Sequence, residues 1–301
     1  MSLIFEKPTI KDKDWVNKVL AKEKRSDVLA VFGAYFLWSD YFNTKICEHR
    51  NILFTRFDSD KTSYLFPKGT KSILGVKNAM DLVFEDYKNL KLPELYISGL
   101  DISEVIKLEK VYPKKFDFIT RRDKFEYIYS SSVLTNLKGK KYHSKRNHIA
   151  KFEKTYDWEY EEINIDNKKK YMDFFEKWFS ENGNPEDKLN TGEYGAIAKA
   201  LDNYKELGLY GGVITVKGQI VACAIGEMLN KKVFVVHFEK ALAEFDGAYA
   251  VINREFSRVV GKNFKYINRE EDLGIDGLRK AKLSYKPAFL ISKFDAKLKE
   301  E

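Results

Sequence analysis

Apolar residues recur with two different spacings along the first half of the chain, and these spacings predict alternating helices and strands. Helices are expected at 15–20, 28–38, 73–90 and 103–112, and strands at 46–57, 62–67, 94–100 and 125–131. Residues 58–61 (DSDK) separate the first two strands and predict a hairpin. The longest apolar run, 28–38 (VLAVFGAYFLW), is too short to span a bilayer and indicates a buried helix.

The second half shows the same alternation. Helices are expected at 140–155, 168–183, 194–207, 248–261 and 277–285, and strands at 158–164, 211–216, 220–228, 233–240, 265–268 and 288–294. Lys217 and Gly218 predict a tight hairpin between two of these strands. Each half therefore reads as a few helices around a mostly antiparallel sheet, which is the α+β pattern. We expect two similar domains, 1–137 and 138–301.

The composition narrows the kind of protein. Apolar residues make up 44% of the 301 residues, which is enough for a hydrophobic core. The net charge of +8 favours anionic partners, although 45 acidic residues argue against a uniformly basic surface. Cys47 and Cys223 are too isolated for a disulfide framework or a zinc site, and the N-terminal stretch lacks the apolar core of a signal peptide. We expect a soluble, reduced, cytoplasmic protein without a metal or an integral membrane segment.

Polar residues interrupt the strand at 233–240 in a pattern that predicts a pocket. Alternation places His237 and Glu239 on one face of the strand. We expect this strand to pair with the strand at 220–228, so that the numbers of opposite residues add up to about 461. The small residues Ala222, Ala224 and Gly226 then lie on the same face as His237 and Glu239. The other face would carry Phe234, Val236 and Phe238. The alternative is that His237 and Glu239 lie on a solvent-exposed face of the sheet and have no function. A shift of the strand register by one residue would also remove the pocket.

The connection that follows this strand offers a second candidate site. Asp246 is expected to cap a helix that begins with Gly247 and Ala248, whose free backbone N–H groups could bind a phosphate. A Gly-Ala helix start is also common without any function. Asn253 and Arg254 follow about two turns later, where solvent exposure is the default expectation.

A basic segment at 138–154 (KGKKYHSKRNHIAKFEK) contains seven Lys or Arg residues and one acid. One face of the predicted helix would carry His143, Arg146, Asn147, Ala150, Lys151 and Lys154, and the buried face Ile149, Phe152 and Tyr156. This pattern predicts a phosphate- or RNA-binding surface, with a solvated amphipathic helix as the alternative.

The stretch 266–287 (YINREEDLGIDGLRKAKLSYKP) changes from acidic to basic around two glycines. Glu270, Glu271 and Asp272 follow a strand, where ligand-binding groups are often found. These acids could hold a cationic amine or take its proton. Salt bridges with Arg269 and Arg279 are the rival interpretation.

Four motifs in this order resemble a bacterial family of uncharacterised proteins allied to the C-terminal domain of phosphatidylglycerol lysyltransferases. They are HSKRNHIAKFEK, FVVHFEKA, GAYAVINREF and YINREEDLGIDGLRKAKLSYKP. The resemblance covers nearly the whole chain and is strongest from 140 to 290. It implies two tandem GNAT (acyl-CoA N-acyltransferase-like) domains, each with a mostly antiparallel mixed sheet flanked by helices, with the active site in the second.

The resemblance also implies an acyl- or aminoacyltransferase. Relatives of this architecture include the Fem-type peptidoglycan ligases, which move an aminoacyl group from tRNA to an amine or hydroxyl. In GNAT proteins the strand that matches 233–240 and the helix that matches 247–260 flank the donor site. The usual glycine-rich loop is reduced here to Asp246-Gly247-Ala248, which speaks against acetyl-CoA and leaves aminoacyl-tRNA open.

Glu239 or Asp272 would act as the base, with His237, Asn253 or Arg254 as polar partners. The donor or substrate would be bound by a wider set, namely Gly247, Ala248, Asn253, Arg254, Glu270, Arg279, Lys282, Lys145, Arg146 and Lys151. The donor is aminoacyl-tRNA or acyl-CoA, and the acceptor is a small amine or an amino-acid-like molecule. The alternatives are a non-catalytic GNAT pair that binds RNA or an amino-acid-like ligand, and an enzyme acting at a lipid surface.

Overall fold

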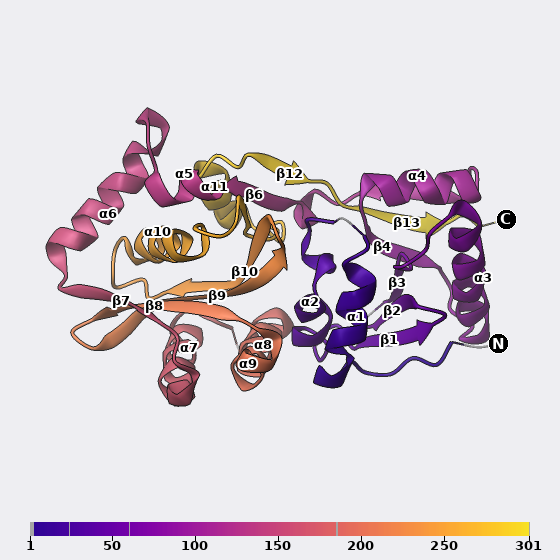
Figure 1. Ribbon diagram of the computed structural model, residues 1–301, viewed down its shortest axis with the longest axis horizontal. Coiled ribbons are helices and arrows are strands. Elements are labelled where there is room, and N and C mark those ends of the chain that lie inside the picture. Colours follow the sequence, from indigo (N-terminus) through magenta and orange to yellow (C-terminus); the bar gives the residue numbers. More distant parts are fainter. Residues whose placement is uncertain (1–2, 24, 60, 185, 301) are drawn as a thin grey trace. The chain divides into compact units, whose positions relative to one another are not determined.

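The computed structural model describes residues 3–23, 25–59, 61–184 and 186–300. The chain forms two compact units, each with its own sheet and core (Figure 1). The first unit comprises the chain up to Arg25, Leu29–Phe125 and the C-terminal stretch from Ile291. The second comprises Ser26–Val28 and Glu126–Leu290.

The described strands of the first unit form one six-stranded sheet in the order β1-β2-β3-β4-β13-β5. These strands are β1 (Thr44–His49), β2 (Ile52–Asp58), β3 (Thr62–Leu65), β4 (Tyr96–Leu100), β5 (Phe116–Thr120) and β13 (Phe294–Leu298). The helices are α1 (Lys13–Leu20), α2 (Phe32–Leu37), α3 (Ile73–Asn89) and α4 (Ile102–Val111), with short 3-10 turns η1 (Ile10–Asp12), η2 (Val28–Ala30) and η3 (Arg122–Lys124). Only β3 and β4 pair in parallel among these strands.

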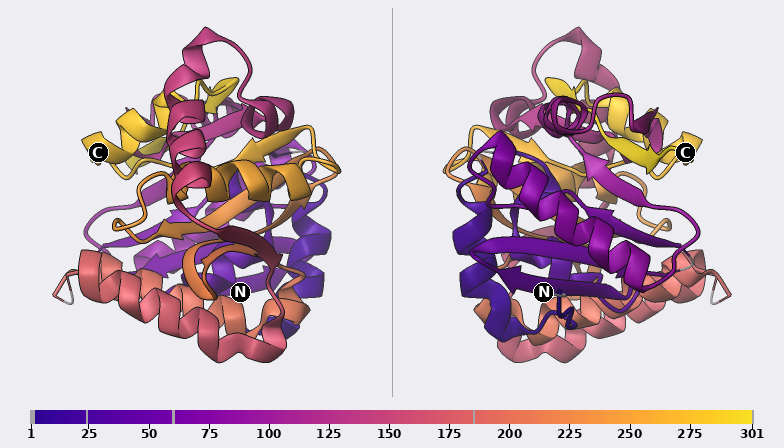
Figure 2. Two further views of the ribbon diagram at one scale, coloured as in Figure 1. Left: turned by 90° about the vertical axis from the view of Figure 1, so that its left-hand side faces the viewer. Right: turned by 90° about the vertical axis from the view of Figure 1, so that its right-hand side faces the viewer.

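One face of this sheet packs on α3, as the right-hand view of Figure 2 shows. Val76, Ala79, Met80 and Val83 recur along the helix at a spacing that places them on one side, and they join the core with strand residues such as Ile97. Ser72 starts the helix, because its side chain accepts a hydrogen bond from the backbone N–H of Gly75.

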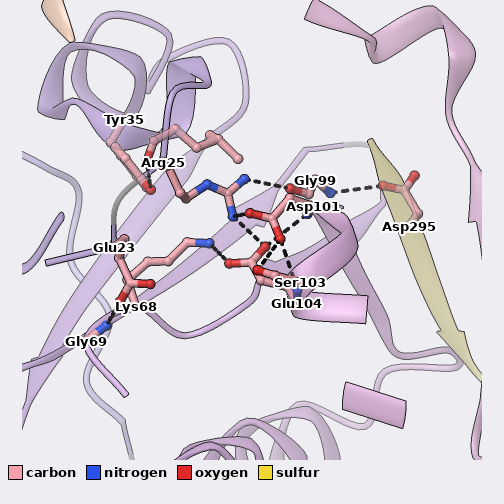
Figure 3. Close-up of polar contacts among 11 residues, drawn as sticks. Glu23, Arg25, Tyr35, Lys68, Gly69, Gly99, Asp101, Ser103, Glu104 and Asp295 are labelled. Atoms are coloured by element: carbon pink, nitrogen blue, oxygen red, sulfur yellow. Dashed lines mark hydrogen bonds and ion pairs between the residues drawn. The ribbon is translucent and has the colours of Figure 1, made fainter. Parts of the chain in front are cut away.

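The first unit also encloses a charged cluster (Figure 3). Lys68 and Arg25 both contact the carboxylate of Glu104, a residue of α4. Arg25 also lies 3.3 Å from Asp101, the residue that caps α4. All three side chains of the Lys68–Glu104–Arg25 group are buried, so their charges are compensated by one another rather than by water.

The described strands of the second unit form a seven-stranded sheet in the order β12-β6-β11-β10-β9-β8-β7. They are β6 (Glu126–Ser130), β7 (Trp158–Glu162), β8 (Tyr210–Val216), β9 (Gln219–Asn230), β10 (Val233–Ala241), β11 (Tyr266–Asn268) and β12 (Phe289–Ile291). The helices are α5 (Ser131–Asn136), α6 (His143–Thr155), α7 (Lys168–Asn182), α8 (Lys188–Asp202), α9 (Tyr204–Leu207), α10 (Ala248–Val260) and α11 (Asp276–Ser284), with 3-10 turns η4 (Lys140–Tyr142) and η5 (Ile165–Asn167).

The second sheet has helices on both faces. α10 covers one face, and α7, α8 and α9 lie on the other (Figures 1 and 2). The core on the α10 side joins Val251 and Phe256 of the helix to Ala222 and Ala224 of β9 and Val236 of β10. Membership of this cluster therefore identifies the strand residues that face α10.

The expected fold class is confirmed, since both units are mixed α+β structures with mostly antiparallel sheets. The units differ from the predicted boundary after residue 137 in two ways. β6 belongs to the second unit because it pairs with β11, and β13 returns to the first sheet between β4 and β5. Both pairings join segments far apart in the sequence, so apolar spacing does not reveal them.

Candidate active site

A β-bulge in β10 decides where the candidate side chains point. Val236 pairs with Gly226 and Phe238 pairs with Ile225, so His237 is an extra residue without a partner in the ladder. The predicted pairing sum of 461 is wrong on both sides of the bulge, since Glu239 lies opposite Ala224. A bulge adds one residue to one strand and changes the alternation beyond it.

The bulge places His237 and Glu239 on opposite faces of the sheet. Glu239 is paired with Ala224, which belongs to the core under α10, and it contacts Asn253 of α10. His237 contacts Glu227, which follows the α10-side residue Gly226 and therefore points to the other face. The predicted shared face of His237 and Glu239 is therefore wrong. Phe234 and Val236 were expected on the face away from Glu239, but they lie on the α10 face with it, while Phe238 pairs with Ile225.

Glu239 is the centre of a polar cluster on the α10 face. Its Oε1 accepts a hydrogen bond from Nη2 of Arg269 at 2.7 Å, and its Oε2 accepts one from Nδ2 of Asn253 at 3.2 Å. Asn253 is buried. Burial acts to lower the pKa of Arg269, but its electrostatic interaction with Glu239 outweighs burial and raises the pKa. The predicted partnership of Glu239 and Asn253 therefore exists in the structure.

Two atoms of this cluster lack partners. Oδ1 of Asn253 and Nη1 of Arg269 are buried and have no hydrogen-bond partner among the described residues. A buried polar atom without a partner costs about 1–3 kcal/mol. A buried acceptor and a buried donor without partners beside one carboxylate are atoms that a ligand or a water molecule would satisfy.

Aromatic rings and a lysine surround the Arg269 side of the cluster. The guanidinium carbon of Arg269 lies 5.0 Å from the ring centre of Tyr285 and 5.7 Å from that of Tyr129. Nζ of Lys145 lies 4.2 Å from the Tyr285 ring. Burial and the charge of Arg269 lower the pKa of Lys145, and burial raises the pKa of Tyr285 to about 12. The cluster thus combines one carboxylate, two cations and two neutral phenols.

On the other face, His237 is held between two carboxylates. Its Nε2 lies 3.0 Å from Oε1 of Glu227, and its Nδ1 lies 2.7 Å from Oε1 of Glu270. Burial lowers the pKa of His237, but the two carboxylates outweigh burial and raise the pKa to about 10. His237 is therefore a charged imidazolium at neutral pH, and both of its N–H groups donate.

We expect His237 to make the stability of the protein depend on alkaline pH. Its folded-state pKa of about 10 exceeds the ordinary value of 6.5, so its contribution is complete below pH 6.5 and is lost as the pH rises through 10. Between pH 7 and 9, the wild type should lose about 2 kcal/mol of unfolding free energy that a His237→Gln variant does not lose. Urea unfolding at both pH values measures this difference.

His49→Gln in β1 is the control for this experiment, and it should follow the wild type. Burial lowers the pKa of Lys282 to about 8, so this lysine changes stability in the opposite direction above pH 8. Lys282 is present in all the variants, so subtraction removes its effect. Equal pH dependence in the wild type and His237→Gln would contradict the charged state of His237.

The acidic loop that begins at Glu270 is held by salt bridges, as the rival interpretation proposed. Asp272 is fully buried and accepts two hydrogen bonds from Arg279, both at 2.9 Å, and one from the hydroxyl of Tyr127 at 2.5 Å. Burial favours the neutral acid, but these donors keep the pKa of Asp272 below its ordinary value. Asp272 therefore does not face an amine, and the structure corrects its assignment as a base.

Lys282 also contacts this loop, through the backbone of the loop. Its Nζ is buried and donates to the backbone carbonyls of Arg269, at 2.5 Å, and Glu271. Together with the Arg279–Asp272 pair, this contact fixes the path of the loop. Arg279 and Lys282 are predicted to bind a ligand, but in the structure both make contacts that hold the loop.

At the predicted phosphate site, the backbone N–H of Ala248 donates to the carbonyl oxygen of Phe245 at 3.0 Å and is therefore not free for a phosphate. Gly247 adopts a φ of +96°, and a Cβ there would lie 2.6 Å from the backbone carbonyl oxygen of His148 in α6. Ala248 is buried. The glycine is required by the left-handed turn and by the close approach of α6, which is a structural explanation for its presence.

Two cations of the basic segment, Arg146 and Lys151, make structural contacts. Arg146 donates to the carbonyls of Leu137 and Gly139, at 2.5 and 2.8 Å, and Lys151 pairs with Asp246. Arg254, expected in solvent, is largely covered and bridges Glu153 and Glu255. Of the cations assigned to donor binding, Lys145 lies beside the Glu239 cluster.

Four residues of this arrangement are not predicted by the sequence pattern. Arg269 is expected only as a counter-charge for its neighbours, and Tyr129 and Tyr285 lie within predicted elements. Glu227, the partner of His237, has no local signal that links it to the histidine. An arginine directly after a short strand was the available signal for Arg269, but its target, Glu239, lies on another strand.

These features define a protein of the GNAT acyltransferase fold, with a polar cluster between the central strands and α10. The chain belongs to the family described as "Phosphatidylglycerol lysyltransferase, C-terminal", whose model matches residues 98–297. The family and the fold support a function of the acyl- or aminoacyltransferase kind.

Solved structures agree with this assignment. A conserved protein of unknown function from Bacteroides thetaiotaomicron is 36% identical, with a TM-score of 0.91 over 99% of this chain and 100% of that one. L-PGS from Bacillus licheniformis is 13% identical, with a TM-score of 0.70 over 99% of this chain and 94% of that one. A tandem GNAT protein from the clavulanic acid biosynthesis pathway is 7% identical, with a TM-score of 0.53 over the full length of both chains, which confirms the tandem GNAT fold.

Within the described part of the chain, the helices are either too short or too polar to cross a bilayer.

Proposed function

We propose that this protein transfers an aminoacyl group from an activated donor to an amine or hydroxyl, with Glu239 as the general base. The observation that carries the proposal is the buried group of Glu239, Asn253 and Arg269, in which one acceptor atom and one donor atom are left without partners. Membership of the lysyltransferase C-terminal family supports the reaction class.

The chemistry follows from the position of the carboxylate. The nitrogen or oxygen of the acceptor attacks the ester carbonyl carbon of the donor, so that a new bond forms to carbon. Glu239 takes the proton of the acceptor, and the C–O bond to the donor breaks. The proton then passes from Glu239 to the leaving hydroxyl. Nη1 of Arg269 stabilises the negative charge that develops on the carbonyl oxygen during these steps.

The open atoms favour an aminoacyl group over a simple acyl group. An α-ammonium group can donate to Oδ1 of Asn253 and to Glu239, while the neighbouring carbonyl oxygen accepts from Nη1 of Arg269. An acetyl group has no donor for Asn253 and would leave its buried Oδ1 unsatisfied. We therefore propose aminoacyl-tRNA as the donor, and acyl-CoA becomes the competing outcome of the test. Lys145 would contribute positive charge beside the anionic donor.

The experiment offers three donors to the purified wild-type protein: a mixture of radiolabelled aminoacyl-tRNAs, acetyl-CoA, and deacylated tRNA as the control. Each donor is tested with a mixture of small amines and hydroxyl compounds, and the products are separated by mass. Transfer from charged tRNA supports the proposal. Transfer only from acetyl-CoA contradicts the aminoacyl assignment. Binding of tRNA without any product would indicate the non-catalytic alternative and overturn the enzymatic proposal.

A further inference from the structure

Two adjacent residues of the loop after β11 connect the two faces of the second sheet. Arg269 reaches Glu239 on the α10 face, while Glu270 reaches His237 on the opposite face. β10 therefore carries one partner for each, Glu239 for the arginine and the bulged His237 for the glutamate. Because Arg269 and Glu270 are consecutive, the side chains of the two residues leave the same turn toward opposite faces of the sheet.

Glu270 is an unfavourable residue for the conformation it adopts. Its φ is +54°, in the left-handed region, which costs a residue with a side chain roughly 1–2 kcal/mol. Its backbone N–H donates to Oδ1 of Asn268 at 2.8 Å, and its carbonyl accepts from the N–H of Tyr127 at 3.1 Å. The side-chain contact with His237 ties Glu270 to β10.

His237 is itself fixed on its other side. Glu227 on β9 accepts from Nε2, so the ring cannot rotate without losing this contact. The imidazole is almost completely covered, with 1% of its side chain exposed, and it does not contact Glu239, Asn253 or Arg269 through any described hydrogen bond. A role in direct contact with substrate on the α10 face is therefore excluded for His237.

We propose that His237 is a positioning residue for the transfer reaction: with Glu227 behind it, it holds Glu270, and through Glu270 it keeps Arg269 directed at Glu239. The inference rests on the proposed function for its effect on turnover, but not for its effect on the position of Arg269. The sequence predicts that His237 acts beside Glu239. In this proposal His237 instead acts indirectly, through Glu270, from the opposite face of the sheet.

A double-mutant cycle of His237→Gln and Glu270→Gln tests this inference. Each single variant should lower kcat by about 10²-fold, since a misplaced Arg269 no longer meets the developing charge, while KM for the donor changes little. The double variant should lose no more than either single variant, because both break the same connection. The control His49→Gln should keep the kcat of the wild type. Losses that multiply in the double variant would overturn the proposal.

A second measurement separates this inference from the proposed function. The guanidinium N–H signals of Arg269 in NMR spectra of the ligand-free protein, assigned by an Arg269→Lys variant, should shift and exchange faster in His237→Gln and Glu270→Gln. This result is expected even if the wild type transfers nothing. Unchanged Arg269 signals in a folded variant would overturn the positioning role. If His237→Gln does not fold, Glu270→Gln and Glu227→Gln provide the same comparison.

Discussion

A Glu239→Gln variant should lose aminoacyl transfer by about 10²–10⁴-fold, the usual contribution of a general base. Glutamine has nearly the same shape and can still accept from Arg269, but it cannot take a proton from the acceptor. The loss should appear in kcat under conditions of saturating donor, because binding groups remain in place. Initial rates of product formation by the variant and the wild type measure it.

Glu244→Gln is the matched control for this variant. Glu244 lies on the connection between β10 and α10, is exposed and pairs with Lys177, so its replacement should leave the rate unchanged.

Asp272→Asn should behave differently from both variants, because it lowers the stability of the protein by loss of the salt bridge with Arg279. Wild-type activity in a folded Glu239→Gln variant would refute the role of Glu239 and leave the mechanism without a base.

A Glu104→Gln variant should destabilise the first unit by about 3–5 kcal/mol. Glu104 is the shared counter-charge of Lys68 and Arg25, and all three side chains are buried (Figure 3). The amide removes the negative charge and leaves the Lys68 ammonium in a site that water does not reach. Chemical unfolding followed by circular dichroism measures the change in free energy.

Asp81→Asn provides the same chemical change at the surface of the same unit. Asp81 pairs with Lys77 one turn earlier on α3, and both side chains are about half exposed, so a change below about 1 kcal/mol is expected. The double replacement Lys68→Met with Glu104→Leu should cost less than Glu104→Gln alone, because it removes the buried ammonium together with its carboxylate, while Arg25 keeps Asp101 at 3.3 Å. Equal effects of Glu104→Gln and Asp81→Asn would contradict the burial of the charged cluster.

Local patterns predicted the elements well where short-range chemistry sets them. Lys217 and Gly218 form the expected tight turn, both with positive φ, and α10 begins and ends within a residue of its predicted limits. The buried side of α6 also holds Ile149 and Phe152, as their spacing predicted. The turn at Arg50 and Asn51, which splits the predicted strand 46–57 into β1 and β2, was missed because its signal is weak, although both residues have positive φ.

The candidate site was predictable only in part. Glu239 and Asn253 were both singled out and lie in contact, but Arg269, which completes the cluster, was not assigned to it. The acids of the 270–272 loop were expected to face a ligand together. Glu270 instead pairs with His237, and Asp272 pairs with Arg279. A carboxylate removed from water is stable only when it is paired with a cation or a hydrogen-bond donor.

The sequence by itself determined the α+β class, the order of most helices and strands, the family and the residue types available for chemistry, since these depend on local spacing and motif. The tertiary structure decided which residues meet: the bulge at His237 reverses the alternation in β10 and sends Glu239 to the α10 face. One inserted residue changes the face of every side chain beyond it, and partners that lie far apart in the sequence leave no local signal of this change.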